Sequence, residues 1–503
     1  MRLMLHTLRK DRRRLWPVAA ASWAMLAVLA HSDRWRADWM ASPLEGWLTL
    51  VLSMAWACLA ALAVLEEPLV GERNFWSTRP YRWPDLLGSK LLFVALTIHL
   101  PLFVADCAVL AARGFNPLAY PGVLLAKQAL LFASLILPAM ALASLVRSFA
   151  QFVIAAFVVA AVIAIVNGGL DQVPEFGRQR DAVHHAAVRM VLAAAAIAAI
   201  AIQYARRRAL PARSVAVLGT CAALAVTTWI PALAEYGPLS GHSQAPPTIA
   251  FNNGPPANGE WAYHFGSRGE TVLLPVEIGA GNRLFHIPLV EIEVTAPDGF
   301  RVRSVQPSPN HPFERIDLFA YAWGPPGLPS KWLVLQFSKP AWDRLQNVRV
   351  DLRGSAGFDF YRNGPTTAIP IRGDAAAPEL GRCSTTMVED PYSDEMLKVL
   401  CESPRPLPVA RVVAHLGDDG EWFGQLNSSR TFEAGPHEIW FSPVNRANYF
   451  FQLTYRSGTR RTVPFRSLSH VDVTPEIPIG TAVAHFDWRG LSLTPWRIDR
   501  NGR

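Results

Sequence analysis

Seven long apolar stretches dominate the first 236 residues of this 503-residue chain, and they constrain its fold more than any other feature. A helix of about 20 apolar residues crosses the roughly 30 Å of hydrocarbon in a bilayer. No water-soluble core needs so many uniformly apolar helices in succession. The sequence therefore predicts an α-helical polytopic membrane domain over residues 15–236, with about seven transmembrane helices. The predicted spans are 15–31, 44–66, 88–112, 121–146, 149–170, 186–205 and 213–235.

The first apolar stretch is open to two interpretations. Its basic start, apolar centre and small residues are also typical of a cleavable signal peptide. Several more spans follow it, so the chain stays in the membrane under either interpretation.

The short loops between the spans differ in their content of Lys and Arg. The N-terminus and the loops on its side of the membrane hold fifteen, and the alternate loops hold six. Because basic loops stay in the cytoplasm, residues 1–14 are predicted to be a cytoplasmic basic N-terminus. Seven spans then place everything after residue 236 on the opposite side. The preference for Arg and Ala hints at a GC-rich bacterium, which makes the membrane a bacterial inner membrane and the far side a periplasm.

The second half of the chain is polar, and it is punctuated by Pro and Gly. Residues 237–260 have the composition of a linker, and short alternating runs typical of strands follow it. This pattern predicts an all-β, β-sandwich-like soluble domain, made of two periplasmic modules at 245–375 and 405–495 with a Cys-bearing connector at 376–404. The runs are 271–280, 289–306, 331–338, 347–354, 408–423, 437–444, 449–465 and 481–488, and turns are predicted within three of them, at Pro297-Asp298-Gly299, Asp419-Gly420 and Ser457-Gly458.

Cys383 and Cys401 are the only cysteines in the polar half. In an oxidising compartment such a pair is typical of a disulfide that closes a short loop, and two free thiols are the alternative. Neither a second Cys pair nor a suitably spaced His pair accompanies them, which argues against a zinc site.

Few ionisable side chains lie inside the predicted spans, where each costs roughly 2.5–3.5 kcal/mol on insertion scales. The candidates are His99 and Asp106 in the third span and Lys127 in the fourth. Asp106 and Lys127 lie at similar depths in antiparallel neighbours, which predicts an intramembrane ion pair near the outer leaflet. Such a pair locks two helices together or lines a substrate path, and snorkelling of the side chains to the interface is the third possibility.

The segment ERNFWSTRPYRWPDLLGSK, from Glu72 to Lys90, separates two apolar stretches and is unlike either. It holds three arginines, one lysine, two prolines and two tryptophans, and the predicted topology places it in the cytoplasm. Its prolines interrupt the preceding helix, and its Trp and Arg side chains suit the level of the lipid headgroups. From physical chemistry alone, an ordinary interfacial turn also accounts for this composition.

The same segment resembles the region between the second and third spans of the ABC-2 type membrane subunits of ATP-binding-cassette transporters. The matching residues are Glu72 and Arg73, then Pro80 and Arg82, then Leu87, Gly88, Ser89 and Lys90. The FWSTRP core from Phe75 to Pro80 is similar to a bacterial branch of these permeases. The resemblance implies a cytoplasmic coupling elbow over residues 66–90 that contacts an ABC-type ATPase subunit. The elbow residues it implies are Glu72, Arg73, Phe75, Trp76, Arg79, Pro80, Arg82, Leu87 and Lys90.

The sequence contains no phosphate-binding G-x-x-x-x-G-K-[ST] loop, so ATP hydrolysis is expected in a partner subunit. This chain is expected to be no enzyme and to bind no cofactor or metal itself. Its expected partners are the ATPase, a second copy or a related permease subunit, and membrane lipid. No basic module for nucleic acid is recognisable, and no nucleophile elbow or metal-ligand spacing occurs in the exported half. The acidic run at 417–422 has the acidity of a calcium-binding loop, but hairpin turns are made of the same residues, and a turn is the favoured interpretation.

These observations predict a permease-like subunit of an ATP-driven transporter, with a periplasmic β-domain that binds substrate or a partner. The alternative is a non-transporting membrane anchor whose β-sandwich domains bind a partner or sense the envelope. A third class, an exported hydrolase on a membrane stem, lacks a catalytic constellation.

Overall fold

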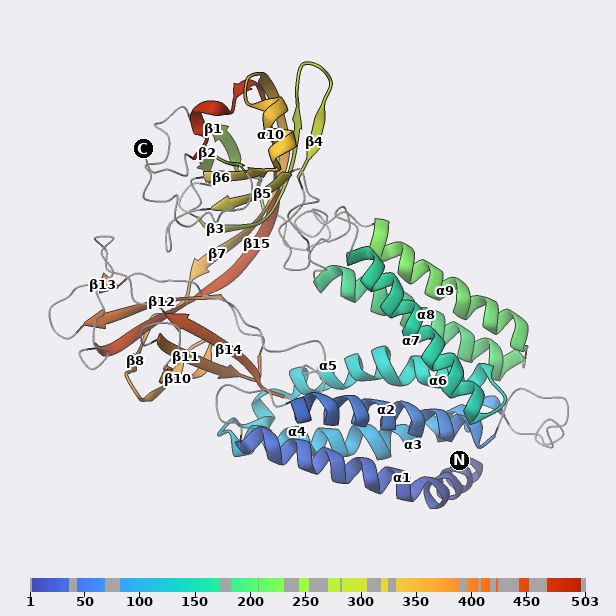
Figure 1. The fold of residues 1–503 in the computed structure, drawn as a ribbon. Coiled ribbons are helices and arrows are strands. Elements are labelled where there is room, and N and C mark those ends of the chain that lie inside the picture. The colour runs from blue at the N-terminus through green and yellow to red at the C-terminus, as the bar shows by residue number, and fades with distance from the viewer. Residues whose placement is uncertain are drawn as a thin grey trace.

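The computed structural model has an N-terminal helical region and a C-terminal β-rich region (Figure 1). Five predicted features lie largely or wholly outside the residues it describes: the elbow segment 72–81, the linker 237–260, the acidic residues 417–421, and the predicted strands 437–444 and 449–465. The described residues are 2–35, 43–67, 82–171, 182–206, 208–229, 244–252, 270–280, 283–304, 318–323, 332–388, 396–405, 409–416, 422–423, 443–451 and 468–498.

Each of the seven predicted apolar stretches corresponds to a helix in the described part of the chain. The third and fourth stretches are each built from two α-helices joined by a π-helical turn. The elements are α1 (Arg2–Trp35), α2 (Pro43–Leu65), α3 (Trp83–Val94), the π-turn η2 (Ala95–His99), α4 (Leu100–Ala112), the short 3-10 helix η3 (Pro117–Ala119), α5 (Pro121–Leu131), the π-turn η4 (Phe132–Ile136), α6 (Leu137–Leu145), α7 (Phe149–Asp171), α8 (Ala182–Arg206) and α9 (Ala209–Trp229).

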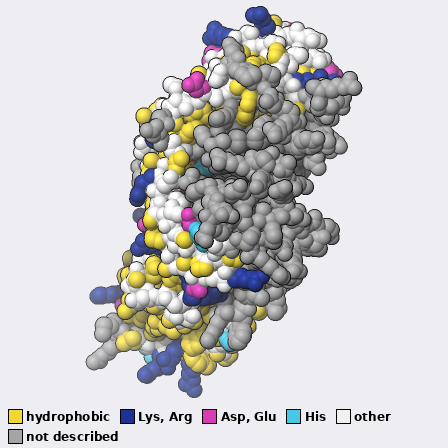
Figure 2. Space-filling model, turned by 90° about the vertical axis from the view of Figure 1, so that its left-hand side faces the viewer, with side chains coloured by type: hydrophobic (Ala, Val, Ile, Leu, Met, Phe, Trp, Pro, Cys, Tyr) yellow, Lys and Arg dark blue, Asp and Glu magenta, His cyan; other side chains and the backbone are white. Residues whose placement is uncertain are grey.

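In the described part of the chain, five helical segments are long and apolar enough to cross a membrane. They are Trp47–Leu65, Trp83–Ala112, Pro121–Leu145, Ala187–Arg206 and Ala209–Val226. The other two predicted spans lie in α1, which begins with a run of charged residues, and in α7, of which Phe149–Val162 is an apolar part. Figure 2 shows that the described side chains of the helical part, at the lower end of that view, are largely hydrophobic, with Lys and Arg at its edge. The protein is therefore membrane-spanning, and the described residues contain five candidate spans where the sequence predicts seven.

Small residues set the packing of the helices. Ala60 and Ala63 on α2 and Ala139 and Ala143 on α6 are all buried in one core cluster, and α2 and α6 are in contact. Small side chains let helix backbones approach closely where lipid supplies no hydrophobic driving force. Gly219 of α9 shows the limit of this approach, because a Cβ at that position would collide with the Cβ of Ala195 on α8.

A proline follows each of the π-turns η2 and η4 in the third and fourth helical stretches. Pro101 comes two residues after η2, and its missing N–H leaves the carbonyl of Thr97 without its usual helical donor. The indole Nε1 of Trp23 on α1 donates to that carbonyl at 2.7 Å. A side chain from a neighbouring helix thus satisfies the freed backbone group, as the absence of water in hydrocarbon requires.

The β-rich region forms three sheets. Their strand orders are β1-β2-β6-β5, then β14-β11-β10-β9, and β13-β12-β15-β7-β3-β4 with β8 paired to β15. The elements are β1 (Thr248–Phe251), β2 (Glu270–Gly279), β3 (Leu284–Thr295), β4 (Arg301–Arg303), β5 (Leu318–Trp323), β6 (Trp332–Phe337), α10 (Lys339–Leu345), β7 (Arg349–Asn363), β8 (Thr367–Pro370), β9 (Asp374–Ala377), β10 (Gly381–Val388), β11 (Met396–Ser403), β12 (Val409–Leu416), β13 (Trp422–Phe423), β14 (Asn445–Phe451), β15 (Leu468–Ser492) and the 3-10 helix η10 (Thr494–Trp496).

The β-rich region has two lobes (Figure 1): the first holds β1–β6 and α10, and the second holds β8–β14. A long ribbon of β7 and β15 runs through both lobes. The two strands pair antiparallel from Arg349 opposite Ser492 to Arg362 opposite Ile477. β15 also pairs with β12, and β7 pairs with β3. The predicted modules at 245–375 and 405–495 therefore share one sheet, a difference from the sequence prediction. Pairing between strands so far apart in the chain leaves no local signal in the sequence.

The C-terminal end of β15 belongs to the core of the first lobe. Ala482, Ala484 and Phe486 are buried in one cluster with Ile292 of β3 and Leu335 of β6. The second lobe contains β10 and β11, which arise from the stretch predicted as a connector at 376–404. That stretch is thus part of a sheet with β9 and β14 rather than a linker between modules.

Candidate functional site

A buried cluster of charged side chains joins α1, the end of α2 and α3. The ammonium Nζ of Lys90 lies 2.7 Å from Oδ2 of Asp11 and also forms an ion pair with Glu67. Lys90 and Asp11 are 0% exposed and Glu67 is 6% exposed. Glu67 directly precedes the segment 68–81, and Lys90 lies in the helix that follows it. The cluster therefore connects the chain on both sides of that segment to Asp11 of the N-terminal helix.

Two further ion pairs surround this buried cluster. Lys10 lies 3.0 Å from Glu67, and Arg14 pairs with Glu66. Three carboxylates thus meet three cations, counting Asp11 and Lys90. Burial raises the pKa of the Asp11 carboxyl, and the Lys90 ammonium opposes that rise. Because removing one partner leaves an uncompensated buried charge, the cluster fixes the relative positions of three helices.

Several predicted elbow residues are placed by the structure. Lys90 is buried in the charged cluster, so its side chain anchors the elbow and is not available on the surface. Arg82 is exposed at the start of α3, and Leu87 is half-buried against the helical core. The other six predicted residues lie outside the described part of the chain: Glu72, Arg73, Phe75, Trp76, Arg79 and Pro80.

Asp11 was missed by sequence reasoning. It lies in the run of basic residues that sets the predicted orientation, where a single carboxylate attracts little attention. A signal was available, however, because Asp11 is the only acidic residue before Asp33. An isolated acid among arginines at a membrane boundary is a candidate partner for a buried cation.

The second buried charged site lies between α4 and α5. Nζ of Lys127 is 2.6 Å from Oδ1 of Asp106, and both side chains are buried. The structure thus contains the ion pair predicted from the sequence. Side chains on a helix lean towards its N-terminus. The N-terminus of α5 lies beside the C-terminal end of α4, so the side chain of Lys127 leans towards the half of α4 that contains Asp106.

The two π-turns meet beside this ion pair. Nδ1 of His99, the last residue of η2, lies 2.8 Å from Oε1 of Gln128 on α5. The His99 ring also packs against Phe132, the first residue of η4, with 5.8 Å between ring centroids. π-Turns inside helices frequently mark functional sites. The buried Asp106, Lys127 and Gln128 and the half-buried His99 are therefore a group of polar side chains in an otherwise apolar helical region.

The far ends of α4 and α5 contact the β-rich region. Nη1 of Arg113, directly after α4, lies 2.9 Å from Oε1 of Glu402 on β11. The guanidinium of Arg405 lies 5.8 Å from the ring centroid of Tyr120. The side chain of Val444 packs with Leu110 and Leu124 in a small apolar cluster. Polar, aromatic and apolar contacts thus connect the second lobe to the α4–α5 end of the helical region.

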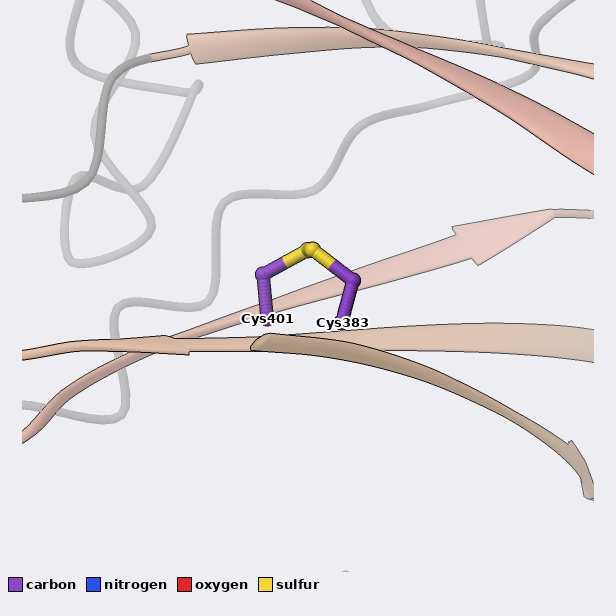
Figure 3. The surroundings of a disulfide bond; sticks show 2 residues. All are labelled: Cys383 and Cys401. Carbon is purple, nitrogen blue, oxygen red and sulfur yellow. A yellow bond between two sulfur atoms is a disulfide. The ribbon is translucent and has the colours of Figure 1, made fainter. Parts of the chain in front are cut away.

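The predicted disulfide lies next to this contact. Cys383 on β10 and Cys401 on β11 are directly opposite in the strand register and are bonded to each other (Figure 3). Both side chains are fully buried. Glu402, which binds Arg113, follows Cys401 in β11, so the bond stabilises the strand pair that carries the contact.

An apolar groove of about 680 Å³ lies between α1 and the η2–α4 part of the third helical stretch, Trp83–Ala112. Trp23, Leu26 and Ala27 form one wall, and Leu100 and Val104 belong to the other. His31 and Arg113 also line it. Asp106 is not among the lining residues, so the groove is separate from the intramembrane ion pair.

Comparison with known proteins gives no relative for this chain. No protein-family model matches it, and no curated protein or solved structure is significantly similar to it. Its function is therefore inferred from its own residues and geometry.

Proposed function

We propose that this chain is the permease-like, membrane-spanning subunit of an ABC-2 type ATP-driven transporter in a bacterial inner membrane. It works with a separate ATPase subunit that docks on the elbow at residues 66–90, and it pairs with itself or with a related permease. The N-terminus is cytoplasmic, all seven helical stretches cross the membrane, and the β-sandwich-like region is periplasmic.

The observation that carries this proposal is the buried cluster of Lys90, Asp11 and Glu67. A loop that only turns the chain at the membrane surface does not need to be fixed at both ends by buried charges. Here the cluster binds the two ends of the segment 68–81 to α1. A force applied to the elbow by a docked subunit therefore reaches α1, α2 and α3 together.

The third rod, Trp83–Ala112, provides a path from the elbow to the β-rich region. It holds Lys90 near its start and Asp106 in its second half, and it is followed directly by Arg113. The π-turn η2 and Pro101 lie between the first two of these contacts. A rod with polar contacts at both ends and a bend between them is suited to pass movement from one side of a membrane to the other.

The contact between Arg113 and Glu402 supports the topology of this proposal. The N-terminal end of α1, which carries Lys10 and Arg14, lies at the other end of the helical region from the junction of α4 and α5 (Figure 1), which carries Arg113 and Tyr120. With the basic ends in the cytoplasm, the β-rich region is on the exported side. In that position it receives substrate from the helices or hands substrate on to a partner.

The test is purification from native membranes in a mild detergent, followed by identification of co-purifying proteins. We expect an ABC-type ATPase in the wild-type preparation and its loss in the Arg79→Glu/Arg82→Glu variant. The buried Lys90 is left unchanged, so that its ion pairs with Asp11 and Glu67 are retained. A control with Arg349→Glu/Arg362→Glu, two exposed residues of β7, should retain the ATPase.

The absence of any ATPase, under conditions that retain known ABC complexes, would refute the proposal. The firm contact of Arg113, Tyr120 and Leu124 with the second lobe would then favour the alternative function, a membrane anchor that binds a partner or senses the envelope through its β-rich region. That alternative predicts that cellular function survives Arg79→Glu/Arg82→Glu.

A further inference from the structure

The N-terminal part of α1 presents a basic face that the ion-pair cluster does not use. Lys10, Asp11 and Arg14 are all engaged with α2 or α3. Arg9, Arg12 and Arg13 are exposed, and they have no ion pair or hydrogen bond with the part of the chain that the structure describes. The five basic residues between positions 9 and 14 therefore divide into Lys10 and Arg14, which form ion pairs, and the exposed Arg9, Arg12 and Arg13.

Helical geometry explains this division. Successive residues of an α-helix are rotated by about 100°, so positions 5, 9, 12, 13 and 16 fall within an arc of about 100°. Asp11 lies on the opposite side of the helix. Because Asp11 is fixed to Lys90, the arc that contains Arg9, Arg12 and Arg13 must point away from the helical region.

Two apolar side chains share this arc with the three arginines. Leu5 is 48% exposed and Trp16 is 49% exposed. Trp16 lies two residues after Arg14, the last charged residue of the segment, where the apolar stretch begins, and its ring contacts Trp23 edge-on with 5.1 Å between ring centroids. Exposed Leu and Trp side chains are unfavourable on a face that contacts only water, whereas a helix at the membrane interface combines Trp and Leu with Lys or Arg.

We infer that Leu5, Arg9, Arg12, Arg13 and Trp16 form a binding face for anionic phospholipid headgroups on the side of the membrane where α1 begins. The guanidinium groups bind the phosphates, and Arg suits them because its donors match phosphate geometry. Trp16 lies at the headgroup level below them. The inference depends on the membrane location and on the α1 geometry, and it stands independently of the proposed transporter function.

The experiment measures lipid binding to the detergent-purified full-length protein by native mass spectrometry. The probes are phosphatidylglycerol, which is anionic, and phosphatidylcholine, which is zwitterionic. The wild type should bind phosphatidylglycerol in preference. In Arg9→Gln/Arg12→Gln/Arg13→Gln that preference should fall by about fivefold for each arginine removed, since one basic side chain near an anionic surface contributes about 1 kcal/mol.

Two further variants separate the charge from the fold. Arg9→Lys/Arg12→Lys/Arg13→Lys keeps the charge and should keep most of the preference. Arg349→Gln/Arg362→Gln removes exposed arginines of β7, outside the helical region, and should leave the preference unchanged. An unaltered preference for phosphatidylglycerol in the triple Gln variant overturns the inference. If that variant keeps its lipids but loses a co-purifying protein, the face binds an acidic protein surface, and the inference is overturned as well.

Discussion

The helical and β-rich regions use their charged side chains in opposite ways. In the helical region, Lys90 and Asp11 are buried and connect α1 to α3, and Lys127 and Asp106 are buried between α4 and α5. In the ion pairs described within the β-rich region the basic side chain is exposed, as in Arg303 with Glu293, where the arginine is 76% exposed. Exposed pairs contribute about 0–1 kcal/mol because water and salt screen them. Buried pairs cost a great deal when one partner is lost.

The two regions also differ in the kind of contact that stabilises them. The helices of a membrane protein have no hydrophobic driving force between them, so buried polar pairs specify which helices meet. The β-rich region has a large apolar core around Trp342, Phe358 and Phe360, and a buried disulfide in its second lobe. This difference predicts which substitutions destabilise each region.

The largest effect is expected for Lys90→Ala. It leaves the buried carboxylate of Asp11 without its cation and Glu67 with only Lys10, at a cost of about 3–5 kcal/mol of stability. Thermal unfolding of the purified protein in detergent measures the loss. Arg82→Ala removes an exposed charge at the start of the same helix and should change stability by less than about 0.5 kcal/mol. Equal stability of the two variants would show that the cluster does not hold the helices together.

The Asp106 and Lys127 pair should show the next largest effect. Asp106→Leu or Lys127→Met alone leaves one buried charge unpaired and should cost about 3 kcal/mol. The double variant removes both charges and should recover most of that loss, because apolar side chains suit the surrounding helices. A double variant that is less stable than both single variants would contradict a structural role for the pair.

The disulfide is expected to contribute slightly less. Cys383 and Cys401 are separated by 18 residues, and closing a loop of that size stabilises a fold by about 2–3 kcal/mol. Cys383→Ala/Cys401→Ala should therefore lower the unfolding midpoint of the strand signal in circular dichroism. Cys221→Ala, which removes an exposed free thiol of α9, provides the control. Equal midpoints for the two variants would exclude a stabilising role for the bond.

The smallest effect is expected for an exposed pair of the β-rich region. A hydrogen bond from Arg489, together with the charge of Arg353, lowers the pKa of Asp487 below its usual value. Its contribution to stability is present above the ordinary pKa of an aspartate and is lost as the pH falls through the lowered value. Asp487→Asn should weaken this acid dependence slightly and leave stability at neutral pH unchanged. A large loss at neutral pH would show that exposed pairs matter here as much as buried ones.

Features with a local cause were predictable from the sequence. The seven apolar stretches all became helices, because their composition alone favours helix in a membrane. Asp106 and Lys127 were recognisable because each is isolated in an apolar run, and Cys383 and Cys401 because they are the only pair in their half. The turn at Asp298-Gly299 followed from its residues, and Gly299 has the positive φ of 84° that such turns require.

Features with a distant cause were not predictable. The β7–β15 ribbon depends on pairing between residues such as Phe358 and Ala482, far apart in the chain. β15 also contains Pro475 and Pro478, which obscure a strand of this length in the sequence. The role of Asp11 depends on Lys90, and a basic run conceals it. The charged cluster at the elbow was therefore visible only once the three helices were placed together.

The central claim is that an ATPase subunit contacts the elbow whose ends are fixed by Lys90, and cross-linking tests it most directly. A photoreactive amino acid placed at position 82 in the full-length chain, in living cells, labels whatever lies against the start of α3. The account predicts a covalent adduct with an ABC-type ATPase from position 82 and none from position 349 on β7. An adduct from position 82 that contains only a protein other than an ATPase, or no adduct at all, would contradict it.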